Sequence, residues 1–229
     1  MKRMGILSLF CATALAVACN SNKTVDNRNE PAAVGTAGEA SSTTVHDSDK
    51  TFVSNMLSDG TAEVELGRMA AQRAVNPDVK RFAQMMVDDH TKAGADLKQV
   101  ASMYSIDVTP QNEDKHKDLM DRLSKLQGRQ FDKEYMKSMV DDHEDAVDSL
   151  ESRVDSTASL KDKVTDGAKA DKQVVAEKSD NAVTASVNAW AANALPVVRR
   201  HLDEAKAIND TLNQNGRTNE TARNNRRAK

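Results

Sequence analysis

The chain has 229 residues, of which 29% are charged and only 3% are aromatic, and its formal net charge is −3. This composition is poor in residues that favour strands and is typical of a helical protein, and the length suits one domain with flexible ends. The last 17 residues hold five basic residues and one acid, so the remainder of the chain is more acidic than the total suggests. An acidic body with a short basic end argues against a nucleic-acid-binding domain.

The first 18 residues have the pattern of a secretory signal. Lys2 and Arg3 precede an apolar run that is too short to span a bilayer. The run ends in Ala-Val-Ala before Cys19, and this ending resembles the lipobox of bacterial lipoproteins, which is cut before the cysteine so that its sulfur can carry lipid. A plain secretory signal starts in a similar way, but a cysteine placed directly after the small residue favours the lipoprotein.

Lipid at Cys19 predicts an envelope protein that is anchored to a membrane. Asn20 follows the cysteine, and by resemblance to Gram-negative lipoproteins it implies the outer membrane, facing the periplasm. Cys11 leaves with the signal, so the mature chain keeps only Cys19 and has no internal disulfide. Residues 19–47 are rich in Ser, Thr, Asn, Ala and Gly and almost free of large apolar residues, which predicts a disordered tether.

The helical part of the chain is predicted to begin next to Ser48, a candidate N-cap. The first helix carries Glu63 on its apolar stripe. Asn76 followed by Pro77 indicates the start of a second helix, because Asn caps helices and Pro suits the first helical position. The second helix is expected to reach about Tyr104.

Two segments repeat the pattern Met-Val-Asp-Asp-His at a spacing of 53 residues. The segments are Phe82–Leu97 and Tyr135–Leu150, and in both the apolar residues recur at the spacing of one helical face. His90 and His143 lie in the middle of these apolar stripes. The repeat therefore predicts two related helices that each turn a histidine towards the core.

Three further helices follow, namely the short Asn112–Leu126, then Arg129–Ser156 with the second repeat, then Asn181–Leu212. The last of them carries His201 on its apolar stripe. Residues 157–180 are rich in Lys and Asp and predict a mobile connection, while residues 213–229 predict a disordered basic tail. Four long helices, one short helix and no strand signal predict an all-α four-helix bundle over residues 48–212.

Several runs in these helices match one known family. They are Ala62–Gly67, Phe82–Gln84, Met86–His90, Phe131–Asp132 with Tyr135, Asp142–His143, and Leu195–Pro196 with His201–Leu202. Together they resemble domain-of-unknown-function family 4142, bacterial envelope proteins with a ferritin-like four-helix bundle. The resemblance extends from about Phe52 to Ile208. It implies the fold and the envelope location, but no established activity.

The chain departs from the di-iron pattern of ferritin-like bundles. Such sites place a carboxylate three residues before each ligating histidine, and here Val87, Val140 and Val198 occupy those positions. A carboxylate-rich di-iron oxidase site is therefore not expected. Asp89 and Asp142 directly precede their histidines, about a quarter-turn round the helix, and are expected to face solvent or a neighbour.

The core histidines allow two hypotheses. In the first, His90, His143 and His201 converge with Glu63 and bind a divalent ion such as zinc, iron or copper. Met86 and Met139, four residues before two of the histidines, would then add thioether ligands and favour copper(I).

In the second hypothesis, the histidines only make buried hydrogen bonds that fix helix register, and the chain is a non-catalytic interaction module on a lipid tether. The sequence has no nucleophile–His pairing, Gly-rich phosphate loop or Cys cluster, so we do not expect an enzyme.

Overall fold

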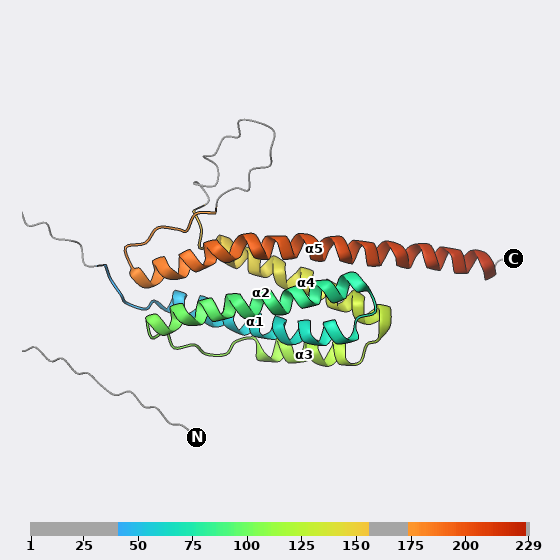
Figure 1. The fold of residues 1–229 in the computed structure, drawn as a ribbon, viewed down its shortest axis with the longest axis horizontal. Helices are drawn as coiled ribbons and strands as arrows, with labels where there is room; N and C mark the ends of the chain where they lie inside the picture. Colours follow the sequence, from blue (N-terminus) through green and yellow to red (C-terminus); the bar gives the residue numbers. More distant parts are fainter. Residues whose placement is uncertain (1–40, 156–173, 228–229) are drawn as a thin grey trace, which may run out of the picture. The chain divides into compact units, whose positions relative to one another are not determined.

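The computed structural model describes residues 41–155 and 174–227, with side chains described as far as Gln214 (Figure 1). Its helices are α1 (Asp47–Arg73), α2 (Pro77–Met103), α3 (Glu113–Ser124), α4 (Gly128–Glu151) and α5 (Ala182–Arg227). The predicted signal, the lipid site at Cys19 and most of the tether lie outside the described residues. None of the described helices is long and apolar enough to cross a membrane.

The four long helices form two hairpins that pack side by side. α1 packs most extensively against α2, which makes the first hairpin, and α4 packs against α5, which makes the second hairpin. Contacts of α2 with α5 and of α1 with α4 close the bundle, while α3 lies against α1 and α4 (Figure 1). The prediction of an all-α bundle with four long helices and one short helix is therefore confirmed.

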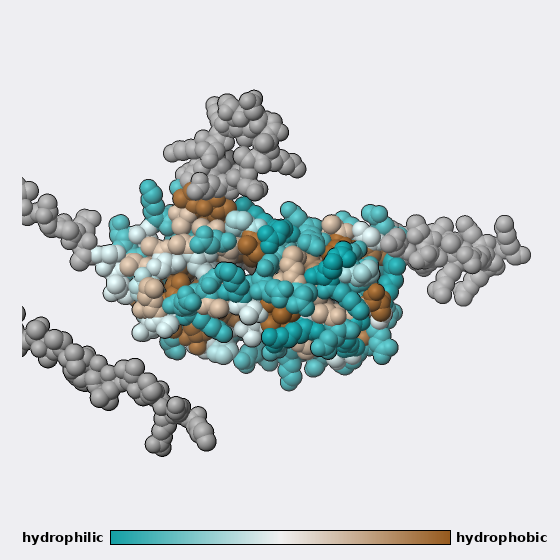
Figure 2. Space-filling view, viewed as in Figure 1, coloured by the Kyte–Doolittle hydropathy of each residue, from teal (hydrophilic) through white to brown (hydrophobic). Residues whose placement is uncertain are grey.

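Two apolar clusters fill the bundle and leave a polar layer between them. The first apolar cluster is built around Phe82, Tyr135 and Met139, and the second around Phe52, Leu97 and Leu150. Along each long helix, one residue of the polar layer stands between members of the two clusters. These four residues are Glu63 in α1, His90 in α2, His143 in α4 and His201 in α5. Outside the core, the face seen in Figure 2 is mostly hydrophilic, with small separate apolar patches.

The predicted boundary at Asn76–Pro77 is confirmed. The Asn76 side chain accepts hydrogen bonds from the backbone N–H groups of Asp78 and Val79, and Pro77 is the first helical residue. The buried Asp132 carboxylate of α4 accepts from the backbone N–H groups of Val75 and Asn76, at 3.1 and 2.9 Å. Thus a side chain of the second hairpin holds the turn of the first.

The start of α1 corrects the predicted cap. The N-cap residue is His46, which was expected in the tether, and Ser48 already lies inside the helix. His46 Nε2 lies 3.2 Å from Asn181 Nδ2, and the same amide group donates to the Thr44 carbonyl at 2.8 Å. Because these contacts come from the start of α5, far along the sequence, the local pattern did not reveal them.

The predicted mobile connection needs a partial correction. Residues 156–173 lie outside the described residues, but residues 175–177 are paired with residues 153–155, which follow α4. Asp155 N–H donates to the Val175 carbonyl at 2.8 Å, and Glu177 N–H donates to the Arg153 carbonyl at 3.0 Å. This pairing follows the end of α4 at Glu151, five residues before the predicted end.

The end of α5 also differs from the prediction of a disordered tail after Leu212. The backbone stays helical to Arg227, although among the side chains described, up to Gln214, Leu212 is the last of α5 that joins an apolar cluster. The segment contains no proline, and its single Gly216 costs a helix only about 1 kcal/mol relative to alanine. The polar composition of residues 213–227 is therefore compatible with a helix, although it predicts a disordered tail.

Gly67 sets how closely α1 approaches α2, and it carries a testable prediction. A Cβ atom there would lie 2.9 Å from the Ala83 carbonyl oxygen and 3.0 Å from Val87 Cγ2. We expect Gly67→Ala to lower the free energy of unfolding by about 1–3 kcal/mol through overpacking. Gly94→Ala is the matched control, because a Cβ there meets nothing within 4 Å, so the higher helix propensity of alanine should leave stability unchanged or raised by up to about 1 kcal/mol. Equal denaturation midpoints for the two variants would contradict the close approach.

Candidate metal centre

The polar layer brings together the three histidines that the apolar stripes singled out. The ring centroids of His90, His143 and His201 form a nearly equilateral triangle with sides of 5.4, 5.5 and 5.6 Å. One ring nitrogen from each histidine lies within 4.8 Å of the other two. When an ion lies about 2.1 Å from one nitrogen of each ring, the ring centroids are about 5.2 Å apart for tetrahedral coordination. For trigonal coordination they are about 5.6 Å apart. The triangle thus has the size that a single ion requires.

Each ring is oriented by an acceptor on one of its two nitrogens. His90 Nδ1 lies 2.8 Å from Glu63 Oε2. His143 Nδ1 lies 2.9 Å from the Met139 carbonyl oxygen and 3.4 Å from Glu63 Oε1. His201 Nε2 lies 2.8 Å from Asp89 Oδ2. Since carboxylate and carbonyl oxygens only accept, each of these ring nitrogens donates.

The opposite nitrogen of each ring has no such acceptor. His90 Nε2, His143 Nε2 and His201 Nδ1 are buried and find no hydrogen-bond partner within residues 41–155 and 174–227. A neutral imidazole that donates from one nitrogen carries a lone pair on the other. When all three rings are neutral, the site therefore collects three buried lone pairs in one layer of the core.

Burial and the Glu63 carboxylate set the charges of the site. Burial lowers the pKa of His201 to about 4, against a smaller opposing effect of Asp89, and burial also lowers the pKa of His143. Burial alone would lower the pKa of His90, but the charge and hydrogen bond of Glu63 outweigh it and raise that pKa. Burial opposes ionisation of Glu63 too, yet His90 and His143 bring its pKa down to about 2. Glu63 therefore favours the charged form of His90, whereas burial favours the neutral forms of His143 and His201.

Glu63 reaches the histidines from the side away from the three lone pairs. Its oxygens contact the Nδ1 atoms of His90 and His143, and it is not part of the group of three ligand atoms within 4.8 Å. Met86 and Met139, suggested as thioether ligands, both belong to the first apolar cluster. The contribution of Met139 to the site is its backbone carbonyl, which orients His143.

Asp89, which its sequence position predicts to face solvent or a neighbour, belongs to the site. Its carboxylate joins His201 and Arg200, both on α5, and Arg200 Nη2 lies 3.1 Å away. The signal that points to Asp89 is its place directly before His90, which turns it towards the helix beside its own. Asp142, at the same place in the second repeat, contacts Lys115 of α3 instead, at 3.0 Å. The aspartate that directly precedes the histidine therefore has a different partner in each repeat.

The family comparison agrees with the sequence motifs. A family model described as domain of unknown function DUF4142 matches residues 34–166. The chain belongs to the DUF4142 family. No curated protein and no solved structure matches the chain. The DUF4142 match covers α1 to α4, with Glu63, His90 and His143, and ends before α5 and His201, whereas the resemblance was expected to reach Ile208.

Proposed function

We propose that this DUF4142 protein binds one divalent metal ion through His90 Nε2, His143 Nε2 and His201 Nδ1. The observation that carries the proposal is the meeting of three histidines whose ring nitrogens lie within 4.8 Å of one another. In each ring one nitrogen is held by an acceptor, and the other is buried without a partner among the described residues. If the histidines served only the core, each unpaired polar atom would cost about 1–3 kcal/mol. A bound ion turns the same three atoms into ligands.

The oxygen acceptors give the proposed site its outer shell. Ligating histidines generally donate their second N–H to a carboxylate or a backbone carbonyl, which fixes the tautomer and makes the ligand nitrogen more basic. Glu63 accepts this second N–H from His90, and the Met139 carbonyl accepts it from His143. Asp89 accepts it from His201. Glu63 is accordingly assigned as an orienting residue rather than as the fourth ligand of the sequence hypothesis.

Three imidazoles favour a borderline transition metal over magnesium or calcium, which prefer oxygen ligands. Zinc fits best, because a site with three histidines leaves a fourth tetrahedral position for water or another small ligand. Copper and iron remain outcomes of the metal analysis. Binding and storage of an ion at the envelope is the function that this donor set supports.

Metal analysis of the full chain, purified without a His tag and then dialysed against one metal at a time, tests the proposal. We expect one zinc per chain for the wild type. His201→Ala should bring the ratio close to zero, while His46→Ala, which alters a histidine at the start of α1, should leave it at one. If all three proteins bind equally negligible amounts of zinc, copper, iron and manganese per chain, the proposed metal site is rejected and the interaction module remains as the hypothesis.

The proposed location rests on the Ala-Val-Ala-Cys ending, which precedes the described residues. Lipid on Cys19 would hold the bundle at the envelope, with the membrane as its partner. We expect the wild type to sediment with membranes and to need detergent for release. Cys19→Ser should leave an unprocessed precursor or a soluble form, and a Ser variant that sediments and extracts like the wild type would reject the lipid anchor.

A further inference from the structure

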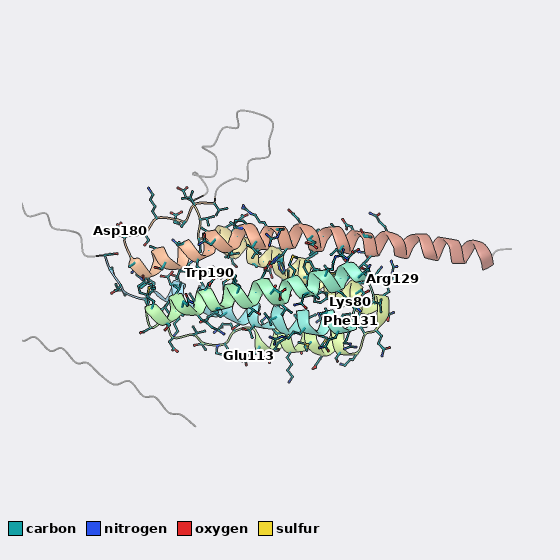
Figure 3. All side chains as sticks on the ribbon, viewed as in Figure 1. Lys80, Glu113, Arg129, Phe131, Asp180 and Trp190 are labelled. Atoms are coloured by element: carbon teal, nitrogen blue, oxygen red, sulfur yellow. The ribbon has the colours of Figure 1, made fainter. Side chains whose placement is uncertain are left out.

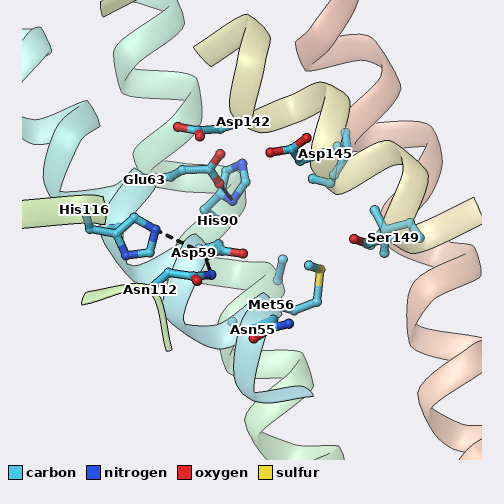
Figure 4. Close-up of a pocket in the computed structure, with 18 of the residues that line it drawn as sticks. Asn55, Met56, Asp59, Glu63, His90, Asn112, His116, Asp142, Asp145 and Ser149 are labelled. Carbon is cyan, nitrogen blue, oxygen red and sulfur yellow. Dashed lines mark hydrogen bonds and ion pairs between the residues drawn. The ribbon is translucent and has the colours of Figure 1, made fainter. Parts of the chain in front are cut away.

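A cavity of about 310 Å³ connects the candidate metal centre with the side of the bundle that α3 covers. Glu63 and His90 line it, as do polar residues from α1, α3 and α4 (Figure 4). The ionisable residues of this outer part are Asp59, Lys115, His116, Asp142 and Asp145. We call this space the α3-side cavity.

Carboxylates dominate the α3-side cavity. Glu63, Asp59, Asp142 and Asp145 oppose the single lysine, Lys115. The Lys115 ammonium lies 3.0 Å from Asp142 and 3.8 Å from Asp145, and its side chain is 56% exposed. The Lys115 ammonium therefore occupies the outer end of the cavity as a cation, and because its side chain is largely exposed, it can move away into solvent. Figure 4 shows the Asp142 and Asp145 side chains on the same side of the cavity as His90.

A second cavity also reaches the centre, between α2 and α5, and has a volume of about 550 Å³. Asp89 and Asp96 oppose Lys92 there, so its lining is less acidic than that of the α3-side cavity. Trp190 lines both cavities, and its Nε1–H donates to the Ala93 carbonyl at 3.2 Å. Figure 3 places Trp190 where α5 faces α2.

The two cavities give a divalent ion two ways to the histidines, and charge discriminates between them. A cleft lined by one sign of charge raises the local concentration and the arrival rate of the opposite sign, an effect that salt weakens. Carboxylates along a path also replace, one at a time, the water molecules that an entering ion must lose. Both effects favour the α3-side cavity.

We propose that the α3-side cavity is the route by which a divalent cation reaches the three histidines, with Asp145 and Asp142 as the transient outer ligands and Lys115 as the cation that the ion displaces. This inference rests on the proposed metal site. The ammonium of Lys115 neutralises the outer carboxylates in the ion-free protein and slows the arrival of other cations. When a divalent ion arrives, Lys115 swings into solvent, and the ion passes to Glu63 and His90.

The test measures how fast Co²⁺ binds to the full-length, metal-free protein, by stopped-flow absorbance of the tetrahedral cobalt site. At low ionic strength we expect Asp145→Asn to bind Co²⁺ about threefold more slowly and Lys115→Met about threefold faster. High salt should reduce both differences. The equilibrium dissociation constants should change less than about twofold, because neither residue contacts the histidines. Asp145 is 79% exposed at its side chain, so its substitution leaves the fold intact.

A neighbouring ion pair on α4 supplies matched controls. Lys137 pairs with Asp141, one residue before Asp142 but away from the cavity. Asp141→Asn and Lys137→Met make the same changes of charge and should leave the rate of Co²⁺ binding unchanged. An effect of these controls as large as that of the cavity variants would mean that net charge alone sets the rate, and it would overturn the route.

Asp96→Asn probes the cavity between α2 and α5. If this variant slows binding and Asp145→Asn does not, the ion enters from the other side and the proposal fails. If no variant changes the rate although the wild type binds Co²⁺, the proposal fails while the metal site stands. If the wild type gives no cobalt spectrum, the metal site itself is rejected.

Discussion

Alanine in place of His143 should abolish the rise in thermal midpoint that a bound divalent ion produces. An ion present at about 1,000 times its dissociation constant stabilises the folded state by about 4 kcal/mol, which corresponds to about 8–16 °C for a domain of this size. His143 is fully buried and supplies one of three convergent nitrogens, so its removal leaves two ligands. Differential scanning calorimetry with zinc and with chelator measures the gain directly.

His116→Ala is the control for this experiment. His116 lies on α3 and pairs with Asp59 at 3.1 Å, outside the group of three histidines. The variant should keep the gain of the wild type at equilibrium. If His143→Ala lowers the midpoint by the same amount with zinc and with chelator, the histidine contributes only to packing and hydrogen bonding.

The zinc-dependent gain should also fall as pH is lowered. A metal needs neutral imidazoles, and Glu63 raises the pKa of His90, so His90 is the first of the three histidines at which protons compete with the ion. His143 and His201 have lowered pKa values and compete for protons only further into the acid range, for His201 near pH 4. The zinc-dependent gain should therefore grow as pH rises above about 7 and vanish near about pH 5, where His90 stays protonated.

Methionine in place of Arg153 should cost about 3–5 kcal/mol, because it leaves a buried carboxylate without its cation. Asp49 has no exposed surface and lies 2.5 Å from Arg153 Nη1, and Thr184 donates to its other oxygen at 2.6 Å. The Arg153 guanidinium also stacks over Phe52, 4.6 Å from the ring centroid. The Asp49 carboxylate at the start of α1 thus joins Arg153, which follows α4, to Thr184 at the start of α5. Urea denaturation of the metal-free protein measures the loss.

Arg199→Met tests whether burial is the cause. Arg199 pairs with Glu151 at 2.6 Å, but both side chains are nearly half exposed, so this variant should cost less than about 1 kcal/mol. The double variant Asp49→Asn with Arg153→Met should recover part of the loss, since it removes the uncompensated charge. Equal losses for Arg153→Met and Arg199→Met would show that the buried pair contributes nothing special.

The helical period was enough to predict which residues meet in the core. Glu63, His90, His143 and His201 each stand on an apolar stripe, and a stripe faces the centre of a bundle whatever the angles between its helices. The period says nothing about which nitrogen of each ring is held. That choice depends on the Asp89 carboxylate for His201 and on a backbone carbonyl for His143.

Contacts between distant segments explain the remaining differences. The tie between Asp49 and Arg153 joins residues 104 positions apart, and neither residue belongs to a local motif that names the other. Asn181 fixes the start of α1 from the start of α5 in the same way. Such pairs become visible only when the packing of the hairpins is known, because a single charged or amide residue in a helical sequence is usually solvated.

The three nitrogens proposed as ligands are divided between the two hairpins, with His90 on the first and His143 and His201 on the second. Binding of an ion and association of the two hairpins are therefore coupled. If the ion strengthens the association of the hairpins by a given factor, separation of the hairpins weakens the affinity for the ion by the same factor. A partner that separates α2 from α5 would therefore lower the affinity for the ion. If the proposed lipid on Cys19 holds the bundle at a membrane, tension that separates the hairpins would likewise lower the affinity for the ion, and a mechanical load would release metal.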